Sequence, residues 1–402
     1  MIRKSIFYFF FILLFACSKK SQKKLIKGNY RAILTVQDNQ KLPFTFTVKG
    51  EKTLIIHNAE ENILVDEITY HKDSVLIQTP VFEGYIKAKI EDDGLVGTFV
   101  KESYDRIVPF KAIKSEQRFE VTKEPTHQIS GNWETVFSKD LKGEYIAKGV
   151  FQQKGNSITG TFRTTTGDYR YLEGVIDGDS LKLSTFDGAH AFLFVAKITD
   201  STMVGDFYSG NHWKEPFVAK LNNGYELPSA EKLTFLKEGF ESLEFSFPDE
   251  NNNLVSLEEK RFKDKVVILQ IMGTWCPNCL DESRFLSKYY QQNKNKDLEV
   301  IALAFEVAKT KEKAFEKINR LKSRLRITYP IALAHFGSEN KIDAHKKLPM
   351  LNHIISFPTT LFIDKKGVVR KIHTGFNGPA TGKLFDEFKK DFENFITMLQ
   401  QE

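Results

Sequence analysis

The feature that most narrows the possible folds is a pair of cysteines placed where a buried strand gives way to a helix. Residues 266–272 (Val-Val-Ile-Leu-Gln-Ile-Met) form an almost continuous apolar run with several β-branched side chains. Such a run is typical of a strand covered on both faces, in a sheet that contains parallel strands. It leads directly into Gly273-Thr274-Trp275-Cys276-Pro277-Asn278-Cys279, and a helical pattern follows to about Gln292. The pattern predicts a strand-turn-helix unit of an α/β domain.

Both cysteines are suited to thiol-disulfide exchange at this position. A thiolate is the nucleophile in that reaction, and the partial positive charge at a helix N-terminus stabilises it. We expect Cys276 to attack, and Cys279, one helical turn later, to close a disulfide with it. Pro277 suits the first turn because its missing N–H group is not needed there.

The alternative for a Cys-x-x-Cys motif is half of a zinc site. Zinc would need two further Cys or His ligands at matched spacing. His335, His345 and His353 lie far along the chain and are expected on the surface or in loops. We therefore expect neither a metal nor an organic cofactor, and only a redox-active disulfide.

From about residue 240 to 402 the chain resembles thioredoxin-fold proteins, and in particular the TlpA/ResA-like thiol-disulfide oxidoreductases, or redoxins, of bacterial envelopes. Two segments carry the resemblance: residues 273–279, quoted above, and residues 356–364, Ser-Phe-Pro-Thr-Thr-Leu-Phe-Ile-Asp. The resemblance implies that the Phe357–Pro358 peptide bond is cis. It also implies that these two residues, with Trp275 and Pro277, contact the substrate chain.

The same resemblance implies a role for Glu282. A partly buried carboxyl beneath the cysteines can take and return the proton of Cys279. The alternative is an exposed acid in the first helical turn, which the helix dipole favours, and Asp281 is expected to be of that kind. The Pro277-Asn278 dipeptide departs from the family's usual Glu-Pro or Gly-Pro. Because that dipeptide influences the redox potential, the direction of electron flow stays open.

The rest of this C-terminal region has the alternation expected of the fold. Residues 298–305 are a second buried strand, and residues 311–325 carry apolar side chains at helical spacing. Residues 359–363 and 368–373 are expected to form a hairpin. An apolar stripe between Leu384 and Leu399 predicts a terminal helix.

The region from Gly28 to residue 222 has a different pattern, with short runs of period two separated by Gly, Asn and Asp turns. This pattern predicts antiparallel β structure, as a barrel or sandwich. The region also repeats itself: Gly28-Asn29-Tyr30 recurs as Gly131-Asn132-Trp133, and Leu95-Val96-Gly97-Thr98-Phe99 as Met203-Val204-Gly205-Asp206-Phe207. We predict two duplicated units, residues 28–120 and 129–222, and a linker, residues 223–239.

Aromatic residues of the second unit allow two interpretations. They either fill the sheet core at period two, which we favour, or line a cavity for an apolar ligand or partner. The residues concerned are Trp133, Tyr169, Tyr171, Phe186, Phe192, Phe194 and Trp213.

The N-terminus predicts export. Residues 1–16 have a basic start and an apolar run too short to span a bilayer, as in a signal peptide. Leu14-Phe15-Ala16-Cys17 resembles the lipobox of bacterial lipoproteins, which implies cleavage before Cys17 and attachment of lipid to its sulfur. Residues 17–27 are lysine-rich and are expected to be a solvated tether. The alternative is an ordinary signal peptide in which Cys17 is incidental.

The amino-acid composition excludes two classes of protein, disulfide-stapled scaffolds and nucleic-acid-binding proteins. Three cysteines are too few for a disulfide-stapled scaffold and divide into Cys17 and the redox pair. The net charge of +6, which falls to +4 without Arg3 and Lys4, is scattered among 52 acidic residues, so nucleic acid is not an expected partner.

We therefore expect a lipid-anchored, periplasm-facing enzyme that reduces disulfides of envelope proteins. The resemblance implies apocytochromes among its substrates and a membrane thiol electron donor. The alternatives are a disulfide oxidase or isomerase, and an envelope binding protein in which the β region has the main role.

Overall fold

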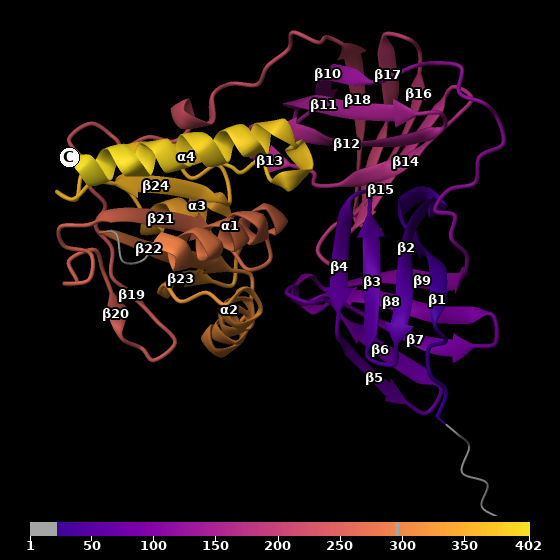
Figure 1. Ribbon diagram of the computed structural model, residues 1–402, viewed down its shortest axis with the longest axis horizontal. Coiled ribbons are helices and arrows are strands. Elements are labelled where there is room, and N and C mark those ends of the chain that lie inside the picture. The colour runs from indigo at the N-terminus through magenta and orange to yellow at the C-terminus, as the bar shows by residue number, and fades with distance from the viewer. Residues whose placement is uncertain (1–21, 294–296) are drawn as a thin grey trace, which may run out of the picture.

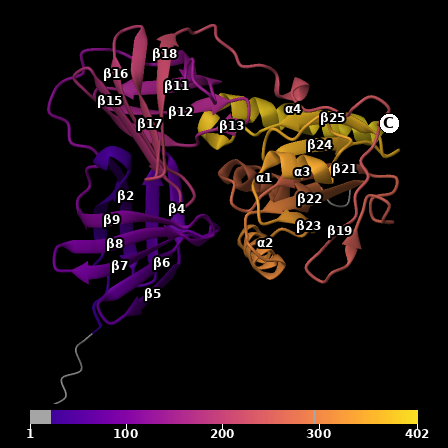
Figure 2. The ribbon, with the colours of Figure 1, turned by 180° about the vertical axis from the view of Figure 1, so that it is seen from behind.

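The computed structural model describes residues 22–293 and 297–402, which form two antiparallel barrels and an α/β domain (Figure 1). The barrels lie one above the other, and the α/β domain lies alongside both, as the opposite view also shows (Figure 2). The predicted signal peptide and Cys17 lie outside the described residues. The expectation of a solvated tether is wrong for residues 22–27, because Leu25 is buried in the core of the first barrel and the N–H of Lys23 donates to the carbonyl of Lys72 at 3.2 Å. None of the helices in the described part of the chain is long and apolar enough to cross a membrane.

The first barrel is a nearly closed antiparallel sheet with strand order β4-β3-β2-β1-β9-β8-β7-β6-β5. Its side chains alternate between a buried apolar interior and the outside, as the period of two predicts; Phe44, Phe46 and Val48 of β2 are buried. Its strands are β1 (Gly28–Thr35), β2 (Lys41–Gly50), β3 (Thr53–Asn58), β4 (Glu61–Val65), β5 (Glu67–His71), β6 (Ser74–Gln78), β7 (Tyr85–Glu91), β8 (Gly94–Lys101) and β9 (Arg106–Lys114).

The second barrel has strand order β11-β10-β18-β17-β16-β15-β14-β12-β13, and a further pairing of β11 with β12 closes it. Phenylalanine rings fill its interior; Phe194 and Phe207, for example, stack with centroids 4.6 Å apart. Its strands are β10 (Gly131–Phe137), β11 (Tyr145–Lys154), β12 (Ser157–Thr164), β13 (Gly167–Asp168), β14 (Leu172–Asp177), β15 (Ser180–Phe186), β16 (Ala191–Ile198), β17 (Thr202–Ser209) and β18 (Trp213–Leu221).

The sequence repeat corresponds to a repeat of structure. Tyr30 of β1 lies opposite Lys114 of β9, and the equivalent Trp133 of β10 lies opposite Leu221 of β18. Each of the two aromatic side chains also donates a hydrogen bond to the carbonyl four residues earlier, at 3.0 and 2.9 Å. The duplicated units therefore share their strand register as well as their sequence.

The aromatic residues for which we weighed core against cavity are mostly core. Trp133, Phe186 and Phe194 are fully buried, whereas the side chain of Trp213 is 52% exposed and is not core. Phe186 belongs to the second barrel by sequence but stacks on Phe44 of the first, with centroids 4.2 Å apart. The two barrels therefore share apolar contacts at their junction.

The C-terminal domain, from residue 240 onward, contains a five-stranded sheet with order β23-β22-β21-β24-β25. The first three strands are parallel to one another, and β24 and β25 run antiparallel. All residues of β21 and β22 are buried, as their apolar runs predict. The elements are β19 (Phe247–Pro248), β20 (Leu254–Val255), β21 (Val266–Met272), α1 (Pro277–Asn293), β22 (Leu298–Glu306), α2 (Lys311–Leu325), β23 (Ile331–Phe336), α3 (Lys341–Lys347), β24 (Thr359–Ile363), β25 (Val369–Thr374) and α4 (Lys383–Gln401).

Helix α2 docks the C-terminal domain on the first barrel through ion pairs. Arg320 contacts the carboxylate of Glu67 at 2.9 and 3.1 Å and donates to the carbonyl of Thr79 at 2.8 Å. Lys317 pairs with Glu83 at 2.5 Å. Every partner is on or beside a strand of the first barrel, so the polar face of α2 is an interface.

A buried arginine joins all three parts of the structure. The guanidinium of Arg170, in the second barrel, pairs with Glu61 of the first barrel, with Asp187 at 3.1 Å and with Asp281 of α1 at 3.1 Å. Arg170 is 2% exposed and Asp281 is 5% exposed. The expectation that Asp281 is a solvated helix-start acid is therefore wrong, because this face of α1 is covered by the barrels.

We expect Arg170→Leu to destabilise the protein by about 3–5 kcal/mol, because it removes the buried cation that Glu61, Asp187 and Asp281 share. His190 and Arg284 stay in contact with Asp187 and Asp281, at 3.2 and 2.9 Å. Urea unfolding measures this free energy. Arg163→Leu is the matched control, since Arg163 is in the same barrel but pairs at 3.6 Å with Glu226, whose side chain is 67% exposed. Equal losses in the two variants would contradict a special role for Arg170.

Candidate active site

The turn after β21 places Cys276 at the start of α1. The indole Nε1 of Trp275 donates to the carbonyl of Phe305 at 2.9 Å, which folds the ring back over Gly273. A Cβ atom at Gly273 would lie 2.3 Å from that nitrogen, so the turn requires glycine. Pro277 is the first residue of α1, as its lack of an N–H group favours.

The two cysteines differ in accessibility. The sulfur of Cys276 accepts a hydrogen bond from the backbone N–H of Cys279 at 3.2 Å, and its thiol donates to the carbonyl of Phe357 at 3.2 Å. Cys276 is 6% exposed and Cys279 is completely buried. Burial raises the pKa of the Cys279 thiol well above its ordinary value, and the neighbouring sulfur of Cys276 adds to this effect. The arrangement suits a first cysteine that is reached from outside and a second that stays protonated behind it.

The second predicted segment lies directly beside the cysteines. The Phe357–Pro358 bond is cis, as the resemblance implies. It comes at the start of β24, where Thr359 lies opposite Ile271 near the end of β21. The ring of Phe357 meets that of Trp275 edge to face, with centroids 5.5 Å apart. Antiparallel pairing of β21 and β24 therefore brings together residues that are 82 positions apart in the sequence.

Glu282 lies beneath the pair, on the turn of α1 that follows Cys279. Its carboxylate accepts hydrogen bonds from Gln270 at 2.8 Å and from Thr360 at 2.7 Å, and it is 1% exposed. Burial raises its pKa to about 7, and the carboxylate in turn raises the pKa of Cys279. The alternative of an exposed helix-start acid is wrong for Glu282.

Two charged residues near the pair were missed by the sequence analysis. Glu306, at the end of β22, is completely buried, and its carboxylate accepts from the N–H of Thr274 at 2.8 Å and from its hydroxyl at 2.6 Å. Burial raises the pKa of Glu306 to about 7. A glutamate closing an otherwise apolar buried strand was the signal that could have found it.

Lys341, at the start of α3, is the second missed residue. Lys341 keeps an exposed surface, and partial desolvation lowers the pKa of its ammonium while a negative charge on Cys276 acts in the opposite direction. In the sequence, Lys341 is one lysine among many, and no pattern marks it.

A turn of the second barrel packs on the active site. The carbonyl of Thr166 accepts a hydrogen bond from Ser356, next to the cis-proline segment, at 2.9 Å. A Cβ atom at Gly167 would lie 2.0 Å from the amide nitrogen of Asn278, between the two cysteines. Gly167 has φ +138, so both its conformation and its surroundings require glycine. The second barrel thus forms one side of the active-site region.

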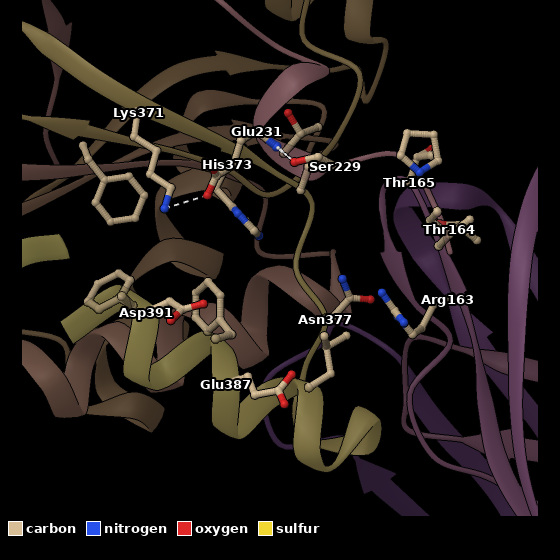
Figure 3. Close-up of a pocket in the computed structure, with 18 residues that line it drawn as sticks. Arg163, Thr164, Thr165, Ser229, Glu231, Lys371, His373, Asn377, Glu387 and Asp391 are labelled. Carbon is tan, nitrogen blue, oxygen red and sulfur yellow. Dashed lines mark hydrogen bonds and ion pairs between the residues drawn. The ribbon is translucent and has the colours of Figure 1, made fainter. Parts of the chain in front are cut away.

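A separate cavity of about 280 Å³ lies between the second barrel, the chain that leads into the C-terminal domain, and α4 (Figure 3). An ion pair between Lys371 and Glu231, at 2.6 Å, lies at one side of it. Its lining includes neither cysteine. Among the described residues, no group of three His, Cys, Asp or Glu side chains could hold a metal ion.

Comparison with known proteins agrees with this geometry. The redoxin family profile matches residues 237–386. The thiol-disulfide oxidoreductase ResA of Bacillus thuringiensis is 31% identical over 134 residues, which are 33% of this chain and 67% of that protein. The chain belongs to the redoxin family. It is a thiol-disulfide oxidoreductase with a thioredoxin-like C-terminal domain.

Other relatives cover the same region of this redoxin. The thioredoxin-like protein YneN of Bacillus subtilis is 29% identical over 146 residues, which are 36% of this chain and 76% of that protein. A crystal structure of a thiol:disulfide interchange protein from Chlorobium tepidum is 17% identical and covers 41% of this chain and 98% of its own, with a TM-score of 0.31.

We expect Glu282→Gln to change how the stability of this redoxin depends on pH. The folded state holds the Glu282 proton up to about pH 7, whereas the unfolded chain releases it near pH 4.5. The contribution of the protonated Glu282 carboxyl to the free energy of unfolding is therefore fully present below pH 4.5 and is lost as the pH rises to 7. The free energy of unfolding falls by about 3 kcal/mol over this range. Urea unfolding at pH 5 and pH 8 should show a smaller decrease for Glu282→Gln than for the unmodified protein.

The control is Glu316→Gln, which removes an exposed glutamate from α2. This variant should keep the full pH dependence. An unchanged pH dependence in Glu282→Gln would show that the buried carboxyl does not titrate in this range.

Proposed function

We propose that this redoxin is a lipid-anchored, periplasm-facing reductase of disulfides in envelope proteins. The observation that carries the proposal is the difference between the two cysteines. Cys276 directly precedes α1 and contacts the cis-proline segment, whereas Cys279 is completely buried on the first turn of α1, near the buried carboxyl of Glu282. The sulfur of Cys276 is therefore placed to attack the substrate, and that of Cys279 to release it.

In the first step, the thiolate of Cys276 attacks one sulfur of the substrate disulfide. A bond forms between Cys276 and that sulfur, the substrate S–S bond breaks, and the departing thiolate takes a proton from water. The N-terminus of α1 stabilises the attacking thiolate. The backbone at Phe357 and Pro358 is the surface on which the substrate chain would lie, beside Trp275 and Pro277.

In the second step, Cys279 attacks Cys276 and releases the second substrate thiol. Cys279 must first lose its proton, which burial makes unfavourable. The carboxylate of Glu282 is the base we assign to this proton, because its pKa of about 7 lets it accept and return a proton near neutral pH. Two electrons pass to the substrate, and the Cys276–Cys279 disulfide is then reduced by an external dithiol.

We assign the reducing direction because the family resemblance implies it, with apocytochromes among the substrates and a membrane thiol as donor. The rival is a disulfide oxidase or isomerase. The reduction potential of the Cys276–Cys279 pair distinguishes them: a value well below about -200 mV fits a reductase, and one near about -120 mV fits an oxidase.

We expect Cys276→Ala to abolish reduction of insulin disulfides, since no other nucleophile is placed at the turn. In Cys279→Ala, Cys276 should still attack the substrate disulfide, but no second cysteine can resolve the mixed disulfide. This variant should therefore accumulate mixed disulfides that survive non-reducing electrophoresis and identify substrates in cells. Substantial insulin reduction by Cys276→Ala would refute the mechanism. Captured proteins confined to the cytosol would refute the proposed location.

The anchor makes a separate prediction. In a bacterial host, the full chain should incorporate labelled fatty acid and sediment with membranes, whereas Cys17→Ala should do neither, because one sulfur carries the attachment. Cys276→Ala is the matched control and should be labelled like the unmodified protein. Equal labelling of Cys17→Ala would overturn the lipid anchor without affecting the redox proposal.

A further inference from the structure

A cavity of about 180 Å³ lies beside the active-site turn, where the C-terminal domain meets both barrels. Trp275 and Pro277, the two neighbours of Cys276 in the chain, form part of its lining. Residues of β8, β9 and the turn between them, residues of the second barrel, and Glu339 form the rest. A molecule that reaches Cys276 from this side therefore passes the barrels.

The end of β8 and the start of β9 present two cations, Lys101 and Arg106, to this cavity. The ammonium of Lys101 lies 4.6 Å from the ring centre of Tyr104 and donates to the carbonyl of Ala189 at 3.1 Å. The guanidinium of Arg106 lies 4.5 Å from the centre of the same ring. The only carboxylate in the lining, that of Glu339, accepts a hydrogen bond from the Tyr104 hydroxyl at 2.8 Å.

Neither cation has a carboxylate partner within 4.0 Å among residues 22–293 and 297–402. This is unlike Arg170, Lys317 and Arg320, which are ion-paired at the same domain junctions. The charges of Glu83, Asp187 and Glu339 act on Lys101, and that of Glu339 acts on Arg106, but none of these carboxylates forms an ion pair with either cation. Withdrawing a cation from water without such a pair is costly. Burial lowers the pKa of Lys101 to about 8, which is the expected sign of that cost.

The remaining lining does not cancel this charge. Burial lowers the pKa of His212 to about 4, so its ring is neutral at pH 7. His190 contacts the buried carboxylate of Asp187 at 3.2 Å, so its ring already has an acidic partner. Counting Lys101, Arg106 and Glu339, the cavity has a net positive charge at neutral pH.

We infer that this cavity binds a carboxylate that the disulfide substrate carries close to the sulfur attacked by Cys276. The inference rests on the proposed function, in which Cys276 is the nucleophile. The carboxylate is bound by charge-assisted hydrogen bonds and is not consumed, and the exchange of sulfur bonds is the one described above. The substrate class is therefore an acidic disulfide, either an Asp- or Glu-flanked cysteine of a protein or a small acidic thiol compound.

Two aromatic disulfides test the charge preference. Dithiobis(nitrobenzoate) carries a carboxylate on each ring, whereas dithiodipyridine is uncharged at neutral pH. We expect Lys101→Gln and Arg106→Gln in the full chain to slow the reaction of the reduced protein with the first probe by about tenfold each. Reaction with the neutral probe should change by less than about twofold.

The matched control is Lys87→Gln, which removes a charge from the exposed side of β7 in the same barrel. It should react like the unmodified protein with both probes. Equal slowing of both probes in Lys101→Gln and Arg106→Gln, or no slowing of either, would overturn the inference. Failure of the unmodified protein to react with the neutral probe would instead overturn the proposed function.

Raising the ionic strength gives a test that needs no variant. Salt should slow the carboxylate probe selectively, and an equal response of both probes would count against the inference. Oxidised glutathione and a pair of disulfide-linked peptides, with Asp or Asn beside the cysteine, identify the source. A faster reaction with the Asp peptide than with the Asn peptide indicates that the substrate is a protein segment. If only the reaction with glutathione is slowed by the variants, the substrate is a small acidic thiol compound. Rates that do not depend on charge for any of the three probes refute the site.

Discussion

The guanidinium of Arg170 holds a carboxylate from each of the three parts of the molecule. Glu61 comes from the first barrel, Asp187 from the second and Asp281 from α1. Arg170, Asp187 and Asp281 are buried and the side chain of Glu61 is 13% exposed, so loss of the arginine charge is costly for the carboxylates around it. The cluster can therefore form only when all three parts are docked together. Because Asp281 follows Cys279 by two residues, the same contact fixes the start of the catalytic helix relative to both barrels.

Docking gives the barrels a part in the active site. The turn at Thr166 and Gly167 packs on Ser356 and Asn278, and the β8–β9 connection reaches the cavity beside Trp275. Cys276 itself is 6% exposed. The surroundings of the active-site turn therefore include residues of both barrels as well as of the thioredoxin-like domain.

Much of the fold was predictable because it depends on local patterns. The α2 helix has the predicted limits, residues 311–325, and β21 and β22 are buried strands as their apolar runs indicate. The cis bond at Pro358 and the burial of Glu282 followed from family resemblance. The short β23 and α3 were not predicted, since neither has a long enough periodic run. Asp281 was wrongly expected in solvent, because helix-start acids usually are.

Local sequence patterns were enough to predict the strand-turn-helix placement of the cysteines, the duplication of the β units, and the strands and helices of the C-terminal domain that have long periodic runs. Periodicity, turn residues and motif spacing are properties of neighbouring residues, so they can be read without the fold. Only the tertiary structure decided which polar residues are buried and paired. Nothing in the sequence distinguishes Arg170 from Lys101. They differ because docking of the domains surrounds Arg170 with three carboxylate partners, whereas Lys101 donates to a backbone carbonyl and has no ion pair among the described residues.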